Sequence, residues 1–273
     1  KLGETIIDPA CGSGGFLYSA LEFMKNQNDN CNISDTIRDN IYGIDINKSI
    51  ARIAKMKLIL EANVETNIYN TNSLKDIDEI KLDFTNEKVI KGFDIVLTNP
   101  PFGTAGKITN KSTLSKFDLG YKWIKSNSSY IKTNKLQKAQ TAEILFIERS
   151  IDLLKEGGRM GIVLPNGHFE NPSLEYLRFY IKQRCKILAI VNLPQETFIP
   201  YGTGVKTSLL FLEKETKNAI TEYNVFFGKI TKLGYQGNKN GNPIYKKDNY
   251  GNKVLNEKNQ PVLDENFSTT IKD

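Results

Sequence analysis

The sequence predicts an α/β fold, a mostly parallel sheet with helices on both faces. Short apolar runs alternate with longer helix-like runs up to about residue 185, and this alternation is typical of βαβ units with parallel strands. A glycine-rich segment, DPACGSGGF over residues 8–16, follows the first apolar run. Parallel α/β sheets bind ligands in such loops, outside the carboxyl ends of their strands.

Seven strands are predicted from short runs rich in β-branched and aromatic residues. They cover residues 4–8, 41–45, 67–71, 93–98, 159–164, 187–193 and 206–212. The last two are joined by a turn-like segment, 194–205, which favours an antiparallel pair that closes the sheet. Helices are predicted over residues 15–25, 48–62, 142–155 and 173–184. Asn47 is placed to cap the second helix, and Gly157 with Gly158 to end the third.

Composition and charge narrow the possible classes of protein. No apolar run reaches the roughly 18–20 residues that span a bilayer, so we expect no membrane segment. The three cysteines, Cys11, Cys31 and Cys185, are far apart and form no CxxC motif. We therefore expect no disulfide framework, no metal site and a reducing cytoplasm. The net charge of +6 is compatible with a polyanion as partner.

The glycine-rich segment and the ends of the next two strands predict a nucleotide-like cofactor. Gly12 and Gly14 let the backbone turn tightly, and the helix that follows offers its N-terminal amides. Asp8 can accept hydrogen bonds from a cationic amine, and Asp45 suits ribose hydroxyls, although NAD-binding folds place an acid there too. The expected cofactor-binding residues are Asp8, Ala10, Cys11, Gly12, Ser13, Gly14, Asp45, Ile46, Asn72, Ser73 and Asn99. Among them, Asn72 could bond the edge of an adenine.

The motif Asn99-Pro100-Pro101-Phe102 follows the fourth strand and points to chemistry on an amino group. An amine on an aromatic ring is a poor nucleophile because its lone pair is delocalised. The Asn99 side-chain oxygen and the Pro100 carbonyl could accept both amine hydrogens and so favour a pyramidal nitrogen, with no metal or strong base. Phe102 and Phe169 are expected to stack on a base removed from its duplex. Together the two loops predict methyl transfer from S-adenosylmethionine to an amino nitrogen, with Asn99 to Phe102 as the catalytic residues.

Two segments depart from the alternation. Residues 103–140 carry eight lysines against one acid, Asp118, with aromatic residues between them. This basic insertion is either a solvated, partly disordered loop or a DNA-contacting loop, with lysines for phosphates and aromatics for bases. Residues 216–273 contain Asn-Gly and Gly-Asn pairs between short β-prone pieces, which predict small hairpins outside the main core, flexible when isolated. We therefore expect a catalytic domain over 1–215 and an extension over 216–273.

At this point the sequence resembles amino-group DNA methyltransferases, specifically the modification subunits of type I restriction–modification systems. The resemblance is carried by DPACGSGGFL, GIDIN, FDIVLTNPPFG, AEILFIERSIDLLKEGGRMGIVLPNG, NPSLEYLRFYI and LPQETFIPYGTGVKTSLLFLEK. It implies a Rossmann-like methyltransferase fold with a seven-stranded sheet, S-adenosylmethionine as donor and adenine in double-stranded DNA as acceptor. It also implies a complex with a DNA-specificity subunit and a restriction subunit. From the resemblance we also expect the family's amino-terminal helical domain to lie outside this sequence.

Other functions remain open at this stage. A similar motif also serves amino-group methyltransferases that act on cytosine, RNA or protein. The sequence could also be an inactive core fragment that acts as an assembly module.

Overall fold

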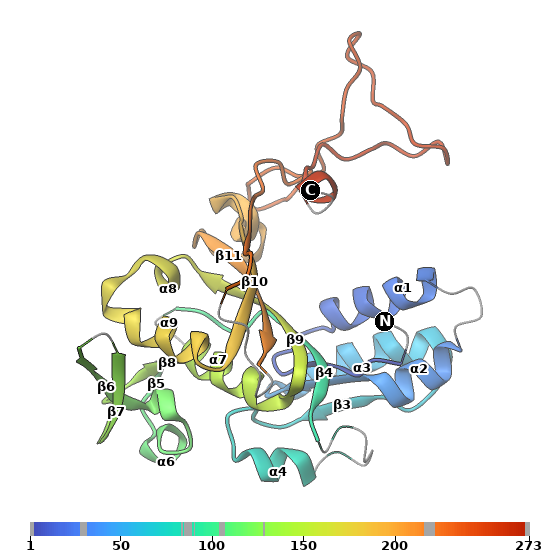
Figure 1. The fold of residues 1–273 in the computed structure, drawn as a ribbon. Coiled ribbons are helices and arrows are strands. Elements are labelled where there is room, and N and C mark those ends of the chain that lie inside the picture. Colours follow the sequence, from blue (N-terminus) through green and yellow to red (C-terminus); the bar gives the residue numbers. More distant parts are fainter. Residues whose placement is uncertain are drawn as a thin grey trace.

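The computed structural model describes residues 3–27, 32–82, 84, 89, 91–103, 107–127, 129–215 and 222–270. Within them the main sheet has eight strands in the order β12-β10-β11-β9-β4-β1-β2-β3 (Figure 1). The strands are β1 (Ile6–Asp8), β2 (Ile41–Asp45), β3 (Asn67–Asn70), β4 (Phe93–Thr98), β9 (Leu154–Pro165), β10 (Cys185–Asn192), β11 (Thr207–Lys214) and β12 (Phe226–Lys229).

The strand directions confirm the predicted mostly parallel sheet. β1 pairs in parallel with β2 and β4, β2 with β3, and β4 with β9. β11 is antiparallel to both of its neighbours, β9 and β10. The seven expected strands are present, and β12 adds an eighth, parallel to β10. Because β12 comes from the segment after residue 215, that segment contributes to the sheet as well as to the hairpins beyond it.

Helices cover both faces of the sheet and enclose two separate apolar clusters. On one face, α1 (Gly15–Gln27), α2 (Ile33–Asn40) and α3 (Lys48–Ala62) pack on the cluster that contains Ile6. On the other, α4 (Ile77–Leu82), α7 (Ala142–Leu153) and α9 (Glu175–Lys182) pack on the cluster that contains Ile7. Neighbouring residues of β1 thus point to opposite faces, as the pleat of a strand requires.

Several boundaries differ from those predicted. α2 and α4 were not expected, because both are short and rich in charged residues. α7 ends at Leu153, and β9 already begins at Leu154, so Gly157 and Gly158 lie in a strand rather than at a helix end. The last predicted helix is divided into a short 3₁₀ turn (Pro172–Leu174) and α9.

The basic insertion is folded into regular structure over its described residues. Two short strands, β5 (Lys107–Ile108) and β8 (Gln140–Thr141), pair with each other, and α6 (Lys111–Leu114) follows β5. Between them a hairpin is formed by β6 (Tyr121–Ser126) and β7 (Ser129–Leu136). The alternative of a partly disordered loop is therefore wrong for these residues.

The extension after β12 projects from the body as a group of tight turns (Figure 1). Isolated bridges such as Tyr235↔Pro243 and Lys247↔Lys253 join its segments. Three backbone bonds close a ring: Lys246 N–H donates to Val262, Val262 to Val254, and Val254 to Lys246. The chain ends its described part in α10 (Phe267–Thr270).

Candidate active site

A cavity of about 650 Å³ lies at the carboxyl ends of β1, β2, β3 and β4. This is the edge of a parallel sheet where ligands are expected to bind. Seven of the residues predicted from the sequence line it: Ala10, Asp45, Ile46, Asn72, Ser73, Asn99 and Pro101. The fold thus brings the glycine-rich loop, the tip of β2 and the Asn-Pro-Pro-Phe motif to one place.

The carboxylate of Asp45 ties two loops together at the cavity wall. One oxygen accepts the backbone N–H of Gly12 at 3.0 Å, and the other accepts that of Asn47 at 2.7 Å. The side chain is half-buried. Because each carboxylate oxygen can accept a second hydrogen bond, both oxygens retain capacity for donors such as ribose hydroxyls.

Asp8 lies beneath the glycine-rich loop and does not line the cavity. It is 2% exposed, and its Oδ1 accepts the backbone N–H of Ala10 at 2.9 Å. Burial raises the pKa of the Asp8 carboxyl to about 7, against the opposing effect of this hydrogen bond. In this structure Asp8 therefore shapes the loop, and a direct contact with a cofactor amine stays a prediction.

The loop itself is held by its backbone. Gly14 has a φ of +80°, and a Cβ there would meet the Cβ of Ala54 at 3.2 Å, so only glycine fits without strain. Cys11 is buried, and burial raises the pKa of its thiol. A protonated thiol is a weak nucleophile, so Cys11 packs under the loop rather than reacting. Ser13 is exposed outside the cavity.

The loop after β3 forms the third wall. The Ser73 hydroxyl donates to the carbonyl of Pro9 at 2.5 Å, which joins this loop to the glycine-rich one. The side-chain oxygen of Asn72 accepts the N–H of Leu74 at 2.9 Å. The exposed NH2 group of Asn72 can donate to a purine edge, and its oxygen can accept one further hydrogen bond.

Asn99 presents a buried acceptor that no described residue satisfies. Its Oδ1 is fully buried and has no hydrogen-bond partner among the described residues. Pro100, next to it, is buried, while Pro101 is exposed at the cavity rim. An unpaired buried acceptor costs free energy, so the Asn99 oxygen is a candidate to accept a hydrogen from a ligand.

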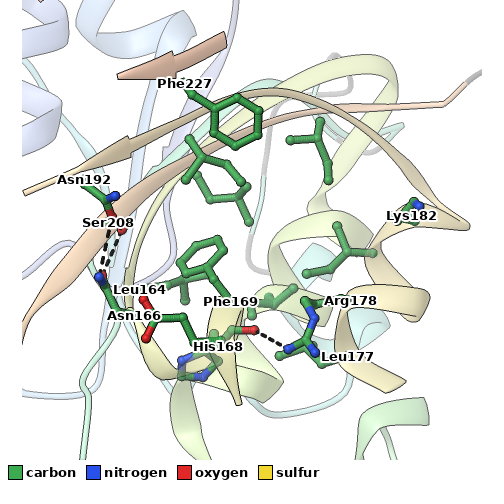
Figure 2. Close-up of a pocket in the computed structure, with 16 residues that line it drawn as sticks. Leu164, Asn166, His168, Phe169, Leu177, Arg178, Lys182, Asn192, Ser208 and Phe227 are labelled. Carbon is green, nitrogen blue, oxygen red and sulfur yellow. Dashed lines mark hydrogen bonds between the residues drawn. The ribbon is translucent and has the colours of Figure 1, made fainter. Parts of the chain in front are cut away.

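The structure does not bring the two predicted stacking residues into this cavity. The ring of Phe102 packs edge-on against Phe198, 6.1 Å between centroids, outside the cavity lining. Phe169 lines a second cavity of about 390 Å³ with Phe227 and Leu177 (Figure 2). One wall of that cavity is polar and consists of Asn166, Asn192 and Ser208. The Ser208 hydroxyl lies 2.8 Å from Oδ1 of Asn166 and 2.6 Å from Oδ1 of Asn192.

Sequence reasoning missed one wall of the main cavity, which the basic insertion and the start of α7 supply. The insertion contributes Lys107, Ile108, Thr109, Asn110 and Thr113, and α7 contributes Ala142 and Phe146. Asn110 caps α6 by accepting the N–H of Thr113 at 3.1 Å, which fixes this wall. The Asn-x-x-Thr pattern at 110–113 is a helix-capping pattern that could have indicated it.

Among the described residues there is no cluster of three or more metal-ligating side chains. No helix in that part of the chain is both long and apolar enough to cross a membrane.

Comparisons with known proteins agree with this arrangement. A family model described as N-6 DNA Methylase matches residues 1–268. The chain is 30% identical over 217 residues to the type I restriction enzyme EcoEI methylase subunit of Escherichia coli, which covers 78% of this chain and 39% of that protein. It is also 30% identical over 216 residues to the MjaIX methylase subunit of Methanocaldococcus jannaschii, covering 78% of this chain and 34% of that protein.

Solved structures show a similar fold. The EcoKI M protein aligns with a TM-score of 0.55 and 25% identity, over 79% of this chain and 40% of that one. A chain from a type I R-M system aligns with a TM-score of 0.64 and 24% identity, over 89% of this chain and 44% of that one. This chain therefore spans less than half the length of these relatives.

Proposed function

This chain belongs to the N-6 DNA methylase family, and from that membership we propose that it is the catalytic core of an adenine-specific DNA methyltransferase. The donor is S-adenosylmethionine, and the acceptor is the exocyclic amino nitrogen of an adenine removed from the duplex. Residues 1–215 form the catalytic domain, and residues 216–273 are an extension that adds a strand to its sheet.

The unpaired oxygen of Asn99 is the observation that carries the proposal. Asn99 lines the main cavity, and its Oδ1 is buried and without a hydrogen-bond partner among the described residues. An adenine amino group would donate a hydrogen to it, and this bond would hold the nitrogen in the orientation needed for attack. Pro100 and Pro101 restrict the backbone on one side of Asn99 and so keep the acceptor in place.

The rest of the cavity fits the proposed cofactor. Asp45 offers carboxylate oxygens to ribose hydroxyls, and Asn72 offers amide hydrogens to an adenine edge. Apolar side chains of Ile46, Leu74 and Phe146 line the same cavity and can enclose a purine ring. When bound, S-adenosylmethionine supplies an electrophilic methyl group on its sulfonium. The loops that would surround the cofactor are held by contacts of Ala10, Gly12 and Ser73.

Partners and location follow from the relatives. Proteins similar to this chain in sequence include methylase subunits of type I restriction enzymes. We infer that the protein acts as the modification subunit of such a system, with a DNA-specificity subunit, a restriction subunit and double-stranded DNA as partners. A bacterial or archaeal cytoplasm, where these complexes meet DNA, is the proposed location.

The experiment uses the full-length protein expressed together with its neighbouring genes. Host DNA is digested to nucleosides, and methylated bases are quantified by mass spectrometry. Asn99→Ala is the test variant, and Asn249→Ala, an exposed asparagine of the extension, is the matched control. We expect N6-methyladenine in the parent and in the control, and none in Asn99→Ala.

Other results would change the proposed acceptor base, the substrate or the role of the chain. Methylated cytosine that depends on Asn99 would change the acceptor base. Methylation confined to RNA or protein would replace DNA as the substrate. If no Asn99-dependent methylation is found, the chain is an assembly module and not an enzyme.

A further inference from the structure

The β6–β7 hairpin has two faces of different character. Side chains alternate between the faces of a strand, and residues directly opposite on paired strands share a face. Trp123 lies opposite Lys132, and Ile124 lies opposite Ile131. The inner face therefore carries Tyr121, Trp123, Lys125, Tyr130 and Lys132. The outer face carries Lys122, Ile124, Ile131, Thr133 and Lys135.

Aromatic side chains of the inner face pack against α9. The ring of Trp123 lies 6.4 Å from that of Tyr176 and 5.9 Å from that of Tyr180. Tyr130 contacts Phe179, with 5.8 Å between ring centroids. The prediction that aromatics of this insertion stack on bases is therefore wrong for Trp123 and Tyr130.

The lysines of the inner face are already paired with carboxylates. Lys125 lies 3.1 Å from Glu175, which also accepts the hydroxyl of Tyr130 at 2.7 Å. Lys132 pairs with Asp118, which also binds Arg184 at 3.1 Å. These contacts fix the hairpin on the body and neutralise the positive charge of its inner face.

The outer face has no acid; Ile124, Ile131 and Lys135 are exposed there, and Lys122 and Thr133 are half-buried. Lys122 and Lys135 take part in no ion pair within the described ranges, and Ile124 and Ile131 are 55% and 52% exposed. The two strands are also joined on this face, where the Thr133 hydroxyl donates to the carbonyl of Lys122 at 2.9 Å. This surface therefore presents two lysines without ion-pair partners on either side of two isoleucines. Such a surface is suited to a polyanion whose sugars offer apolar edges.

We propose that the outer face of the β6–β7 hairpin binds the backbone of duplex DNA, with Lys122 and Lys135 on phosphates and the isoleucine pair against deoxyribose. The inference rests on the proposed function, because it assumes that DNA is the substrate. Its position supports it: the hairpin belongs to the same insertion as Lys107 and Thr113, which line the cavity with Asn99. DNA whose base enters the cavity therefore passes close to this insertion.

The test measures affinity for non-specific duplex DNA over a series of salt concentrations, using the full-length protein. Lys122→Gln/Lys135→Gln should weaken binding by about tenfold and reduce the slope of log K against log salt by about 2. Arg52→Gln/Lys55→Gln is the charge-matched control, on exposed positions of α3 at the opposite face of the sheet. It should leave both quantities close to those of the parent.

A second variant separates apolar contact from charge. Ile124→Thr/Ile131→Thr keeps β-branched residues in the hairpin and should weaken DNA binding several-fold with an unchanged salt slope. If the lysine variant retains the parental affinity and slope while Asn99-dependent methylation of DNA persists, the inference is overturned and the proposed function stands. Loss of binding to another subunit with unchanged DNA affinity would also overturn it, because the surface would then be a protein interface.

Discussion

The carboxylate of Asp45 and the backbone N–H of Gly12 lie 3.0 Å apart, although 33 positions separate them in the chain. This contact joins the tip of β2 to the glycine-rich loop after β1. The acid that suits ribose hydroxyls thus also holds the loop that would surround the rest of the cofactor. Cofactor affinity and loop geometry are therefore linked through one side chain.

We expect Asp45→Ala to weaken cofactor binding by at least about tenfold, or about 1.4 kcal/mol. The variant loses both the carboxylate acceptors and the bonds to Gly12 and Asn47. Calorimetric titration of the full-length protein with S-adenosylmethionine measures the change. Asp78→Ala, an exposed acid of α4, is the control. Equal affinities of Asp45→Ala and the parent would show that Asp45 does not contact the cofactor.

Asn99→Ala should lower the rate of methyl transfer by about 100-fold or more, while the affinity for the cofactor changes less than about twofold. The reason is that the unpaired Oδ1 is placed for the acceptor base. Transfer of a labelled methyl group to DNA and calorimetric cofactor binding are measured on the same preparation. A similar loss in both quantities would mean that the motif is structural.

Asp8 should make the stability of the protein depend on pH. Its pKa is raised to about 7 by burial, above its ordinary value of 3.8. The folded state therefore holds a proton that the unfolded state has lost, and the free energy of unfolding falls as pH rises from about 4 through 7. We compare the Tm of Asp8→Asn with that of the parent at two pH values. The Tm of the variant minus that of the parent should be a few degrees larger at pH 8 than at pH 5. A Tm difference that is the same at both values would contradict this.

Glu148 of α7 anchors the start of the hairpin segment. Its two carboxylate oxygens accept the N–H groups of Asp118 and Leu119, each at 2.7 Å. Glu148→Ala leaves both donors without a partner and should lower the free energy of unfolding by about 2–4 kcal/mol. Urea unfolding measures the loss. Exposed Glu156→Ala should change it by no more than about 0.5 kcal/mol, and a similar effect of both variants would exclude a specific anchor.

Features with strong local patterns were predictable from the sequence. β1 and β2 are short, largely apolar runs that are buried on both faces, and their parallel direction follows from the helices between them. The cap at Asn47 is confirmed, since its side chain accepts the N–H groups of Ser49 and Ile50. The cavity also follows from topology, because strands of one direction end at one edge.

Other features depend on contacts between distant segments and were missed. In the β6–β7 hairpin, lysines alternate with aromatics, and the pattern is polar enough to suggest a loop. Its stability comes from α9, more than 35 residues later in the chain, through Tyr176 and Glu175. Phe169 was expected in the target pocket because it follows β9, but the short helix α8 (Gly167–Glu170) turns it into the second cavity.

The unpaired oxygen of Asn99 has a consequence for how such a chain would change over generations. A buried acceptor without a donor lowers the stability of the free protein, and an apolar residue that fits the same space would remove the deficit. A lineage propagated only for expression and solubility should therefore drift toward apolar residues at position 99. Retention of asparagine requires a cell in which the reaction itself confers an advantage.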